Sequence, residues 1–331
     1  MRCNVKDKHP SIPYFHTQGL TSRFIFDQKM STTVGQSTLS TTINSTSNHS
    51  QRSIQHSTTL MVTYSMVLVT GTISLGLMMH ILKSSSTSIT SIAVFNLIFA
   101  HFIFLLTVPF RIYYYATEDW TLSFGWCKVV SSMIHIHMYM SFTFYVIILL
   151  MRLASFYHNG EQLASFQRIH AVLASFVLWI VVLVSVPCII FFVYGKGGNT
   201  NHSTKTCFEF GYSIQNSVKI LNYFISILII VVATVLTALQ TNVLRVLYRK
   251  HHQGITSQQD FGAQLKSLFF ALIMVVCFIP YHMFRLYYLE NTEELQGVNE
   301  VFLALTTFNC LDMLTFLGRR TCYMCLSEKT I

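Results

Sequence analysis

Residues 127–152 read CKVVSSMIHIHMYMSFTFYVIILLMR, an apolar stretch with a cysteine at one end and an arginine at the other. As a helix, which rises about 1.5 Å per residue, this stretch is roughly 37 Å long. The hydrocarbon core of a bilayer is about 30 Å thick, so the stretch is long enough to cross it with some tilt. We therefore predict a transmembrane helix, with Cys127 and Arg152 near opposite membrane surfaces.

The composition of the whole chain is that of a membrane protein. Hydrophobic residues make up 52% of the chain and charged residues 11%, whereas a soluble domain has about 25% charged residues. The formal net charge is +9. Its basic residues are scattered at the ends of apolar runs, which favours a lipid bilayer over nucleic acid as the partner.

Sequence motifs of enzymes and cofactor-binding proteins are not found. The eight cysteines show no paired metal-ligand spacing. The chain also lacks a phosphate-binding glycine loop, a GxSxG motif and an HExxH motif. We therefore expect no enzymatic activity, no metal ion and no cofactor.

Polar and apolar segments divide the chain into three parts. Residues 1–57 are rich in Ser, Thr, Asn and His, so we expect a disordered segment. Residues 58–320 hold seven apolar runs, which predict an all-α bundle of seven transmembrane helices, because lipid cannot satisfy an exposed backbone. Residues 321–331 form a short tail. The runs are 59–82, 89–115, 127–151, 169–194, 216–247, 264–289 and 298–318.

The distribution of charge predicts how these helices are oriented. One set of connections is basic and the other set is acidic, and the positive-inside rule places the basic set in the cytoplasm. The N-terminus is then extracellular and the C-terminus cytoplasmic. Three sequons, at Asn44, Asn48 and Asn201, all fall on the predicted outside, where glycosylation takes place. The first run is expected to act as the insertion signal, since no signal peptide precedes it.

Several short motifs recur in a defined order along the runs. In chain order they are Asn96-Leu97-x-x-Ala100, Trp120-x-x-x-Phe124-Gly125-x-Cys127, Arg152, Trp179, Pro187, Cys207, Cys277-Phe278-Ile279-Pro280-Tyr281-His282 and Asp312-Met313-Leu314-Thr315-Phe316. Together they resemble the rhodopsin-like G-protein-coupled receptors over residues 58 to 320. The segments Leu106–Arg111 and Cys277–Leu289 resemble the branch that includes purinergic nucleotide receptors.

The resemblance implies a disulfide and a ligand site on the extracellular side. It pairs Cys127 with Cys207, which suits an oxidising exterior. His282 and Arg285 share one helix face and resemble the element by which nucleotide-type receptors hold anionic ligands. The expected ligand contacts are Arg111, His135, His282 and Arg285. The implied partner is an unknown extracellular ligand with an anionic group. The alternative is that both arginines only reach lipid headgroups or pair with Glu290 and Glu118.

The resemblance also implies a cytoplasmic switch and a heterotrimeric G protein as partner. Arg152 is expected to face the G-protein cavity and to pair with Asp260. Pro280, with Phe278 below it, predicts a kink about which the sixth helix moves. Cys322 and Cys325, next to basic residues, suit palmitoylation.

Several positions depart from the family pattern. His101 replaces the usual acid of the second helix, so we expect a hydrogen bond to Asp312 and no sodium regulation. Met151 replaces the acid before Arg152, and Met313 and Phe316 replace the proline and tyrosine of the seventh helix. A constitutively active or ligand-independent modulatory protein of the same fold therefore stays open as an alternative. A transporter or channel is disfavoured because the runs show no internal repeat.

Overall fold

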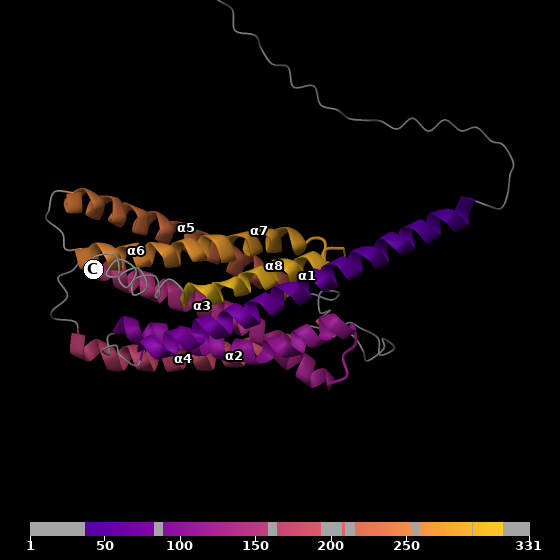
Figure 1. Ribbon diagram of the computed structural model, residues 1–331, viewed down its shortest axis with the longest axis horizontal. Coiled ribbons are helices and arrows are strands. Elements are labelled where there is room, and N and C mark those ends of the chain that lie inside the picture. Colours follow the sequence, from indigo (N-terminus) through magenta and orange to yellow (C-terminus); the bar gives the residue numbers. More distant parts are fainter. Residues whose placement is uncertain are drawn as a thin grey trace, which may run out of the picture. The chain divides into compact units, whose positions relative to one another are not determined.

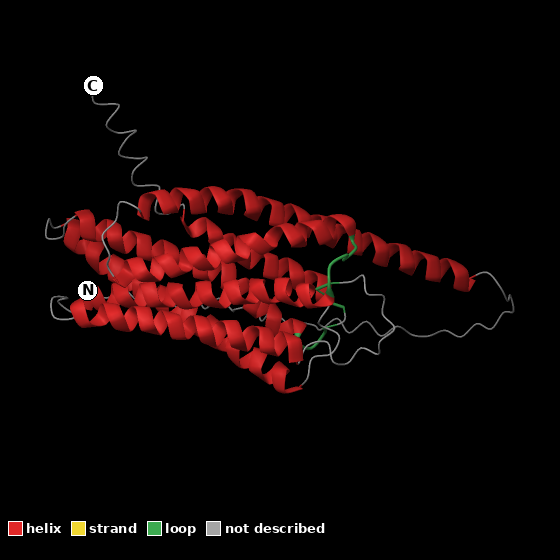
Figure 2. Ribbon diagram, turned by 90° about the horizontal axis from the view of Figure 1, so that it is seen from below, coloured by secondary structure: helices red, strands yellow, loops and turns green. Residues whose placement is uncertain are grey.

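The computed structural model describes residues 37–82, 89–157, 164–192, 207–208, 216–252, 258–292 and 294–313, with side chains over somewhat shorter ranges. Within these ranges all regular structure is helical (Figure 2). The elements are α1 (Ser37–Leu82), α2 (Ile89–Thr117), α3 (Phe124–Tyr157), α4 (Ala164–Phe192), α5 (Asn216–His252), α6 (Gln258–Ile273), η2 (Met274–Phe278), α7 (Ile279–Tyr288), α8 (Gln296–Thr306) and η3 (Thr307–Met313). The bundle belongs to the compact unit Asn48–Ile331.

The helices confirm the predicted all-α transmembrane bundle, whereas the orientation of its two termini stays a prediction. Six helical segments of the described chain are long and apolar enough to cross a bilayer. The sixth of them is continuous through α6, η2 and α7. The seventh predicted run corresponds to α8 and the 3₁₀ helix η3, which reaches residue 313, the last of the described residues. Helix α1 begins at Ser37, before the boundary expected at residue 57, and that domain boundary stays a prediction.

Helix α3, which contains most of the stretch 127–152, lies at the centre of the bundle. It contacts α2, α4, α5, α6 and both η segments. In Figure 1 it runs between the pair α2 and α4 and the group α5, α6 and α7. In the most apolar 18-residue segment of α3, 61% of the segment is buried, whereas the corresponding share in α4 is 17%. The stretch that predicted a spanning helix is therefore also the core around which the other helices pack.

Helices at the periphery expose apolar faces. Ile169 is 74% exposed, Ile220 69% and Val276 70%. Leaving such faces in water costs about 25 cal/mol for each Å² of apolar surface. Lipid tails remove this cost, so these faces fit the hydrocarbon core of a membrane.

The sixth span changes its helical winding just before Pro280. Residues Met274–Phe278 form one π-helical turn, and Pro280 lies in the first turn of α7. Proline cannot donate the backbone hydrogen bond of a continuous α-helix, and a π turn is a common way to accommodate this loss. The turn places Phe278 in the core, where its ring packs against Phe142 and Tyr145 at centroid distances of 5.6 and 6.1 Å.

Candidate functional site

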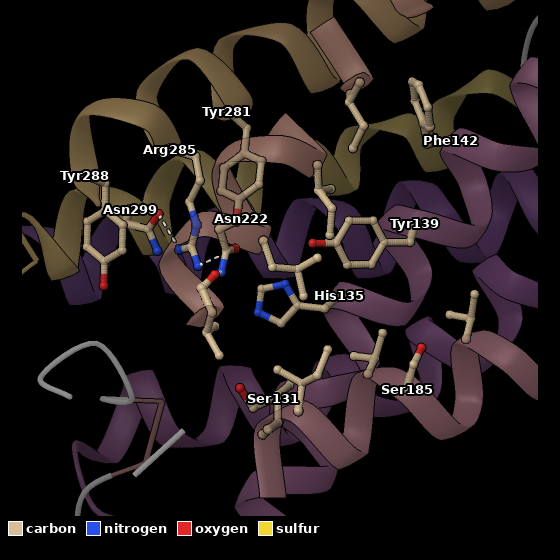
Figure 3. Close-up of a pocket in the computed structure, with 18 of the residues that line it drawn as sticks. Ser131, His135, Tyr139, Phe142, Ser185, Asn222, Tyr281, Arg285, Tyr288 and Asn299 are labelled. Atoms are coloured by element: carbon tan, nitrogen blue, oxygen red, sulfur yellow. Dashed lines mark hydrogen bonds between the residues drawn. The ribbon is translucent and has the colours of Figure 1, made fainter. Parts of the chain in front are cut away.

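A cavity of about 390 Å³ lies among α3, α4, α5, α7 and α8 (Figure 3). Phe208, which follows the disulfide residue Cys207, also lines it, so the cavity is at the disulfide end of the bundle. One part of the wall is aliphatic, from residues of α4 and α5. The polar lining consists of Ser131, His135, Tyr139, Thr143, Ser185, Asn222, Tyr281, Arg285, Tyr288, Gln296, Asn299 and Glu300. A hollow of this size with convergent polar groups is typical of a small-molecule site.

Arg285 is a cation in the wall of this cavity. Its guanidinium donates hydrogen bonds to the side-chain oxygens of Asn299, at 3.2 Å, and Asn222, at 3.3 Å (Figure 3). It also lies 5.0 Å from the ring centroid of Tyr288. The side chain is 7% exposed, so these contacts hold it in one orientation. Arg285 therefore lies in the cavity wall, and its predicted contact with a ligand stays a prediction.

Arg111 is not among the residues that line the cavity. Its Nη1 is 3.8 Å from Oε2 of Glu300, a lining residue, and donates to the Tyr64 hydroxyl at 3.3 Å. Its Nη2 donates to the carbonyl oxygen of Val130 at 3.4 Å. The ring of Phe208 covers the guanidinium at 4.3 Å. The predicted ligand contact of Arg111 stays a prediction, and its acidic partner is Glu300 rather than the Glu290 or Glu118 of the alternative interpretation.

The two predicted histidine contacts differ in position. His135 lines the cavity together with Arg285 (Figure 3). His282 does not line it, and its Nδ1 is 3.2 Å from the Ser226 hydroxyl. His282 and Arg285 are both buried, but only Arg285 reaches the cavity.

The predicted disulfide between Cys127 and Cys207 is present. It anchors Phe208, whose backbone φ of 71° is unusual for a residue with a bulky side chain. Phe208 packs on Tyr114 and Trp120, at centroid distances of 5.2 and 5.8 Å. Its carbonyl oxygen accepts a hydrogen bond from Gln296 Nε2 at 3.2 Å. Such a backbone conformation persists only where the surroundings determine it, so Phe208 is a positioned cap over Arg111.

Glu290 lies beyond the end of α7 and is exposed. Its carboxylate accepts hydrogen bonds from the Tyr223 hydroxyl and, at 3.0 Å, from Lys219. Both donors favour the charged form and lower the pKa of the Glu290 carboxyl. Glu290 was an alternative partner for the arginines, but these contacts join it to α5.

A second group of polar residues lies in the middle of the bundle. Nε2 of His101 is 3.4 Å from Oδ2 of Asp312, in agreement with the expected hydrogen bond. The Tyr145 hydroxyl donates to the same oxygen at 2.5 Å. Nδ1 of His101 is 2.8 Å from Nε2 of His137. The sequence prediction missed His137, although the spacing His135-Ile136-His137 offered a signal.

Comparison with known proteins identifies the fold family. The family described as 7 transmembrane receptor (rhodopsin family) matches residues 74–313. The chain belongs to this family. Its members are multi-pass plasma-membrane receptors that couple to G proteins and are not enzymes.

Individual relatives of the receptor carry names of the same kind. The chain is 37% identical over 262 residues to Probable G-protein coupled receptor 141 of Homo sapiens, and the alignment covers 76% of this chain and 85% of that protein. It is 24% identical over 277 residues to Probable G-protein coupled receptor 34 of Pan troglodytes, with coverages of 77% and 71%. It is 28% identical over 149 residues to a purinoceptor of Mus musculus, with coverages of 44% and 39%. The receptor resemblance inferred from the motifs is thereby confirmed.

Arg152 lies near the end of α3, in the receptor region expected to meet the G protein. Its side chain is partly buried. Asp260 lies in the first turn of α6, but its side chain is outside the described part. The predicted pair therefore stays a prediction.

The modification sites of the receptor lie outside the described side chains. Asn44 and Asn48 fall within α1, in a part for which no side chain is described. Asn201, Cys322 and Cys325 lie outside the described residues altogether. Glycosylation and palmitoylation remain predictions.

Proposed function

We propose that the receptor binds an anionic ligand in the cavity lined by Arg285 and passes the signal to a heterotrimeric G protein through movement of the sixth span. The observation that carries this proposal is the buried guanidinium of Arg285 in the cavity wall, fixed by two side-chain amides. A held, desolvated guanidinium is a strong partner for a carboxylate or phosphate.

The charges around the cavity support an anion. Arg111, Arg285 and Glu300 are gathered at this end of the bundle, and Glu300 both lines the cavity and pairs with Arg111. The set holds two cations and one anion, so an anionic group would balance it. The aromatic rings of Tyr139, Tyr281 and Tyr288 line the same space. One relative is named a purinoceptor, which is in keeping with an anionic nucleotide-type ligand.

The proposed movement starts at the π turn. Phe278 ends this turn, and its ring contacts Phe142 and Tyr145 of α3. Tyr281, three residues later, lines the cavity. A ligand that contacts Tyr281 or Arg285 would therefore bias the packing of Phe278 and the position of α6. This requires that the ligand bind more tightly to one conformation of the sixth span than to the other.

We expect Arg285→Ala to reduce the potency of the ligand by about 10- to 100-fold, because a hydrogen bond to a charged group contributes about 1.5–3 kcal/mol. The measurement is a cell signalling assay with nucleotides, lipid acids and peptides with free carboxylates as probes. Surface expression is measured in parallel.

Lys128→Ala is the matched control for Arg285→Ala. It removes a cation from the same end of the bundle, where Lys128 Nζ donates to the Phe191 carbonyl at 3.2 Å and does not line the cavity. We expect unchanged ligand potency in this variant. An agonist that acts equally on the Arg285→Ala receptor would contradict the proposed site.

Asp260→Ala tests the proposed restraint on Arg152. A partly exposed pair contributes about 0.5–1 kcal/mol, so its loss should raise basal signalling about two- to fivefold. Basal cAMP and calcium are measured at equal surface expression, with Gln259→Ala as the neighbouring control. Basal signalling that is unchanged in Asp260→Ala would argue against the pair. High basal signalling of the native receptor that Arg152→Ala abolishes would instead favour the constitutive alternative.

A further inference from the structure

Three metal-ligand side chains from three separate helices meet in the middle of the bundle. They are His101 of α2, His137 of α3 and Cys310 of η3. Their ligand atoms all lie within 4.8 Å of one another. Each residue is at most 3% exposed. The sequence showed no metal spacing because these residues are far apart in the chain and are joined only by the fold.

The distances between these atoms resemble those of a tetrahedral zinc site. With Zn–N bonds of about 2.05 Å and Zn–S bonds of about 2.3 Å, neighbouring N and S ligands lie about 3.6 Å apart and two N ligands about 3.3 Å apart. Cys310 Sγ is 3.5 Å from His101 Nδ1 and 3.6 Å from His137 Nε2. The two nitrogens are 2.8 Å apart, so the rings would separate by about 0.5 Å on binding.

Neighbouring groups already orient the rings of His101 and His137 for a metal ion. His101 presents Nδ1 to the cluster while its Nε2 contacts the Asp312 carboxylate at 3.4 Å. This carboxylate–histidine arrangement is the usual support of a metal-bound imidazole. Tyr145 holds the same carboxylate. Phe104 stacks on the His137 ring at 4.3 Å, with an interplanar angle of 17°, and so fixes its plane.

Charge and ligand type favour zinc over a hard cation such as sodium. Imidazole and thiolate ligands suit zinc and copper, whereas sodium, magnesium and calcium prefer oxygen. The charge of a divalent ion would be cancelled by the negative charges of the Cys310 thiolate and the nearby Asp312 carboxylate. Neutrality matters because an uncompensated charge in a bundle core is costly.

We expect a water molecule to occupy the fourth ligand position of the zinc ion. Ser141 lies four residues after His137, on the same face of α3. Its side chain is 0% exposed, and its hydroxyl has no hydrogen-bond partner among the described side chains. In the proposed site this hydroxyl would form a hydrogen bond with that water.

We propose that His101, His137 and Cys310 bind one zinc ion, with Asp312 supporting His101. The ion would join α2, α3 and η3 and so stabilise the packing of the seventh span against the second and third. Without the ion, the hydrogen bond between His101 Nδ1 and His137 Nε2 holds α2 and α3 together. The two states differ in metal content, which makes them distinguishable by experiment.

The test uses the full-length receptor purified in detergent, stripped with a chelator, incubated with zinc chloride and dialysed. We expect about one zinc per chain by elemental analysis, and a melting temperature raised by roughly 5–10 °C when free zinc is about 100 times its dissociation constant. Cys310→Ser and His137→Gln should lose both effects. Cys188→Ser and His282→Gln are the matched controls, because Cys188 is an exposed cysteine of α4, His282 lies in α7, and neither belongs to the cluster. Both variants should keep the bound zinc and the raised melting temperature.

Cobalt replacement of zinc gives a readout that does not depend on how well a variant folds. In the native receptor, bound cobalt(II) should show a thiolate-to-cobalt absorption band and the visible bands of a tetrahedral site. Copper(I) bound in preference to zinc would overturn the assignment of the metal. Absence of stoichiometric metal from the native receptor, or retention of zinc by Cys310→Ser, would overturn the site.

Discussion

Arg111→Ala is expected to destabilise the receptor by about 3–5 kcal/mol, because it leaves the buried carboxylate of Glu300 without its ion-pair partner. Arg111 is 1% exposed and Glu300 is 15% exposed at the side chain. The substitution also removes the hydrogen bonds to Tyr64 and the Val130 carbonyl and the contact beneath Phe208. We expect a melting temperature lower by about 6–15 °C in detergent, measured with the purified receptor.

A second substitution separates the ion pair from the loss of packing. Glu300→Gln in the Arg111→Ala background removes the uncompensated charge, so it should recover part of the lost stability. Lys128→Ala is the control for loss of a buried cation, because its hydrogen bond goes to a neutral carbonyl oxygen, and it should cost less. If Arg111→Ala melts at the native temperature, or Glu300→Gln restores nothing, the structural role assigned to Arg111 is wrong.

Cys127→Ser is expected to have the second large effect on stability. The two disulfide cysteines are 80 residues apart, and the chain-entropy relation gives about 4.5 kcal/mol for a loop of this length. The value is an upper bound here, because spanning helices remain formed in the membrane-inserted unfolded state and the loop is already constrained. We expect a loss of about 2–4 kcal/mol, measured by thermal unfolding and by surface expression.

The loss of the disulfide should also act on the cavity. Phe208 is held next to Cys207 in a conformation that its side chain disfavours, and its release would uncover Arg111 and open one wall. Cys188→Ser is the control, since Cys188 is a free and exposed cysteine of α4. Cys207→Ser should match Cys127→Ser, and the double variant should be no worse than either. Additive losses in the double variant would mean that the two thiols act separately.

Much of the fold was predictable from local sequence. The apolar runs are long enough to require helices, since a backbone in lipid has no other way to satisfy its hydrogen bonds. The stretch 127–152 was recognisable as a span from its length and composition alone, and it is the central helix. Pro280 predicted an irregularity in the sixth span, because proline lacks the donor of a regular helix. The structure then showed its form, a π turn at Met274–Phe278.

The candidate site was predictable only in part. Arg285, His135 and the disulfide were expected from motifs and lie at one end of the bundle. Asn222, Asn299 and Glu300 carry no local signal, because an amide or acid within an apolar run does not show which helix faces it. The different surroundings of Arg111 and Arg285 depend on helix rotation and packing, which hydrophobic patterns define only loosely when a helix is apolar on all sides.

The sequence by itself determined the class of protein: a helical membrane bundle, with its spans, its central helix and its family motifs, because each of these depends on composition and local spacing. Only the tertiary structure decided that Arg285 lines the cavity while Arg111 is paired with Glu300 outside the lining. It also brought His101, His137 and Cys310 together from positions up to 209 residues apart. Contacts between distant positions depend on how helices pack, and no local pattern of residues records that packing.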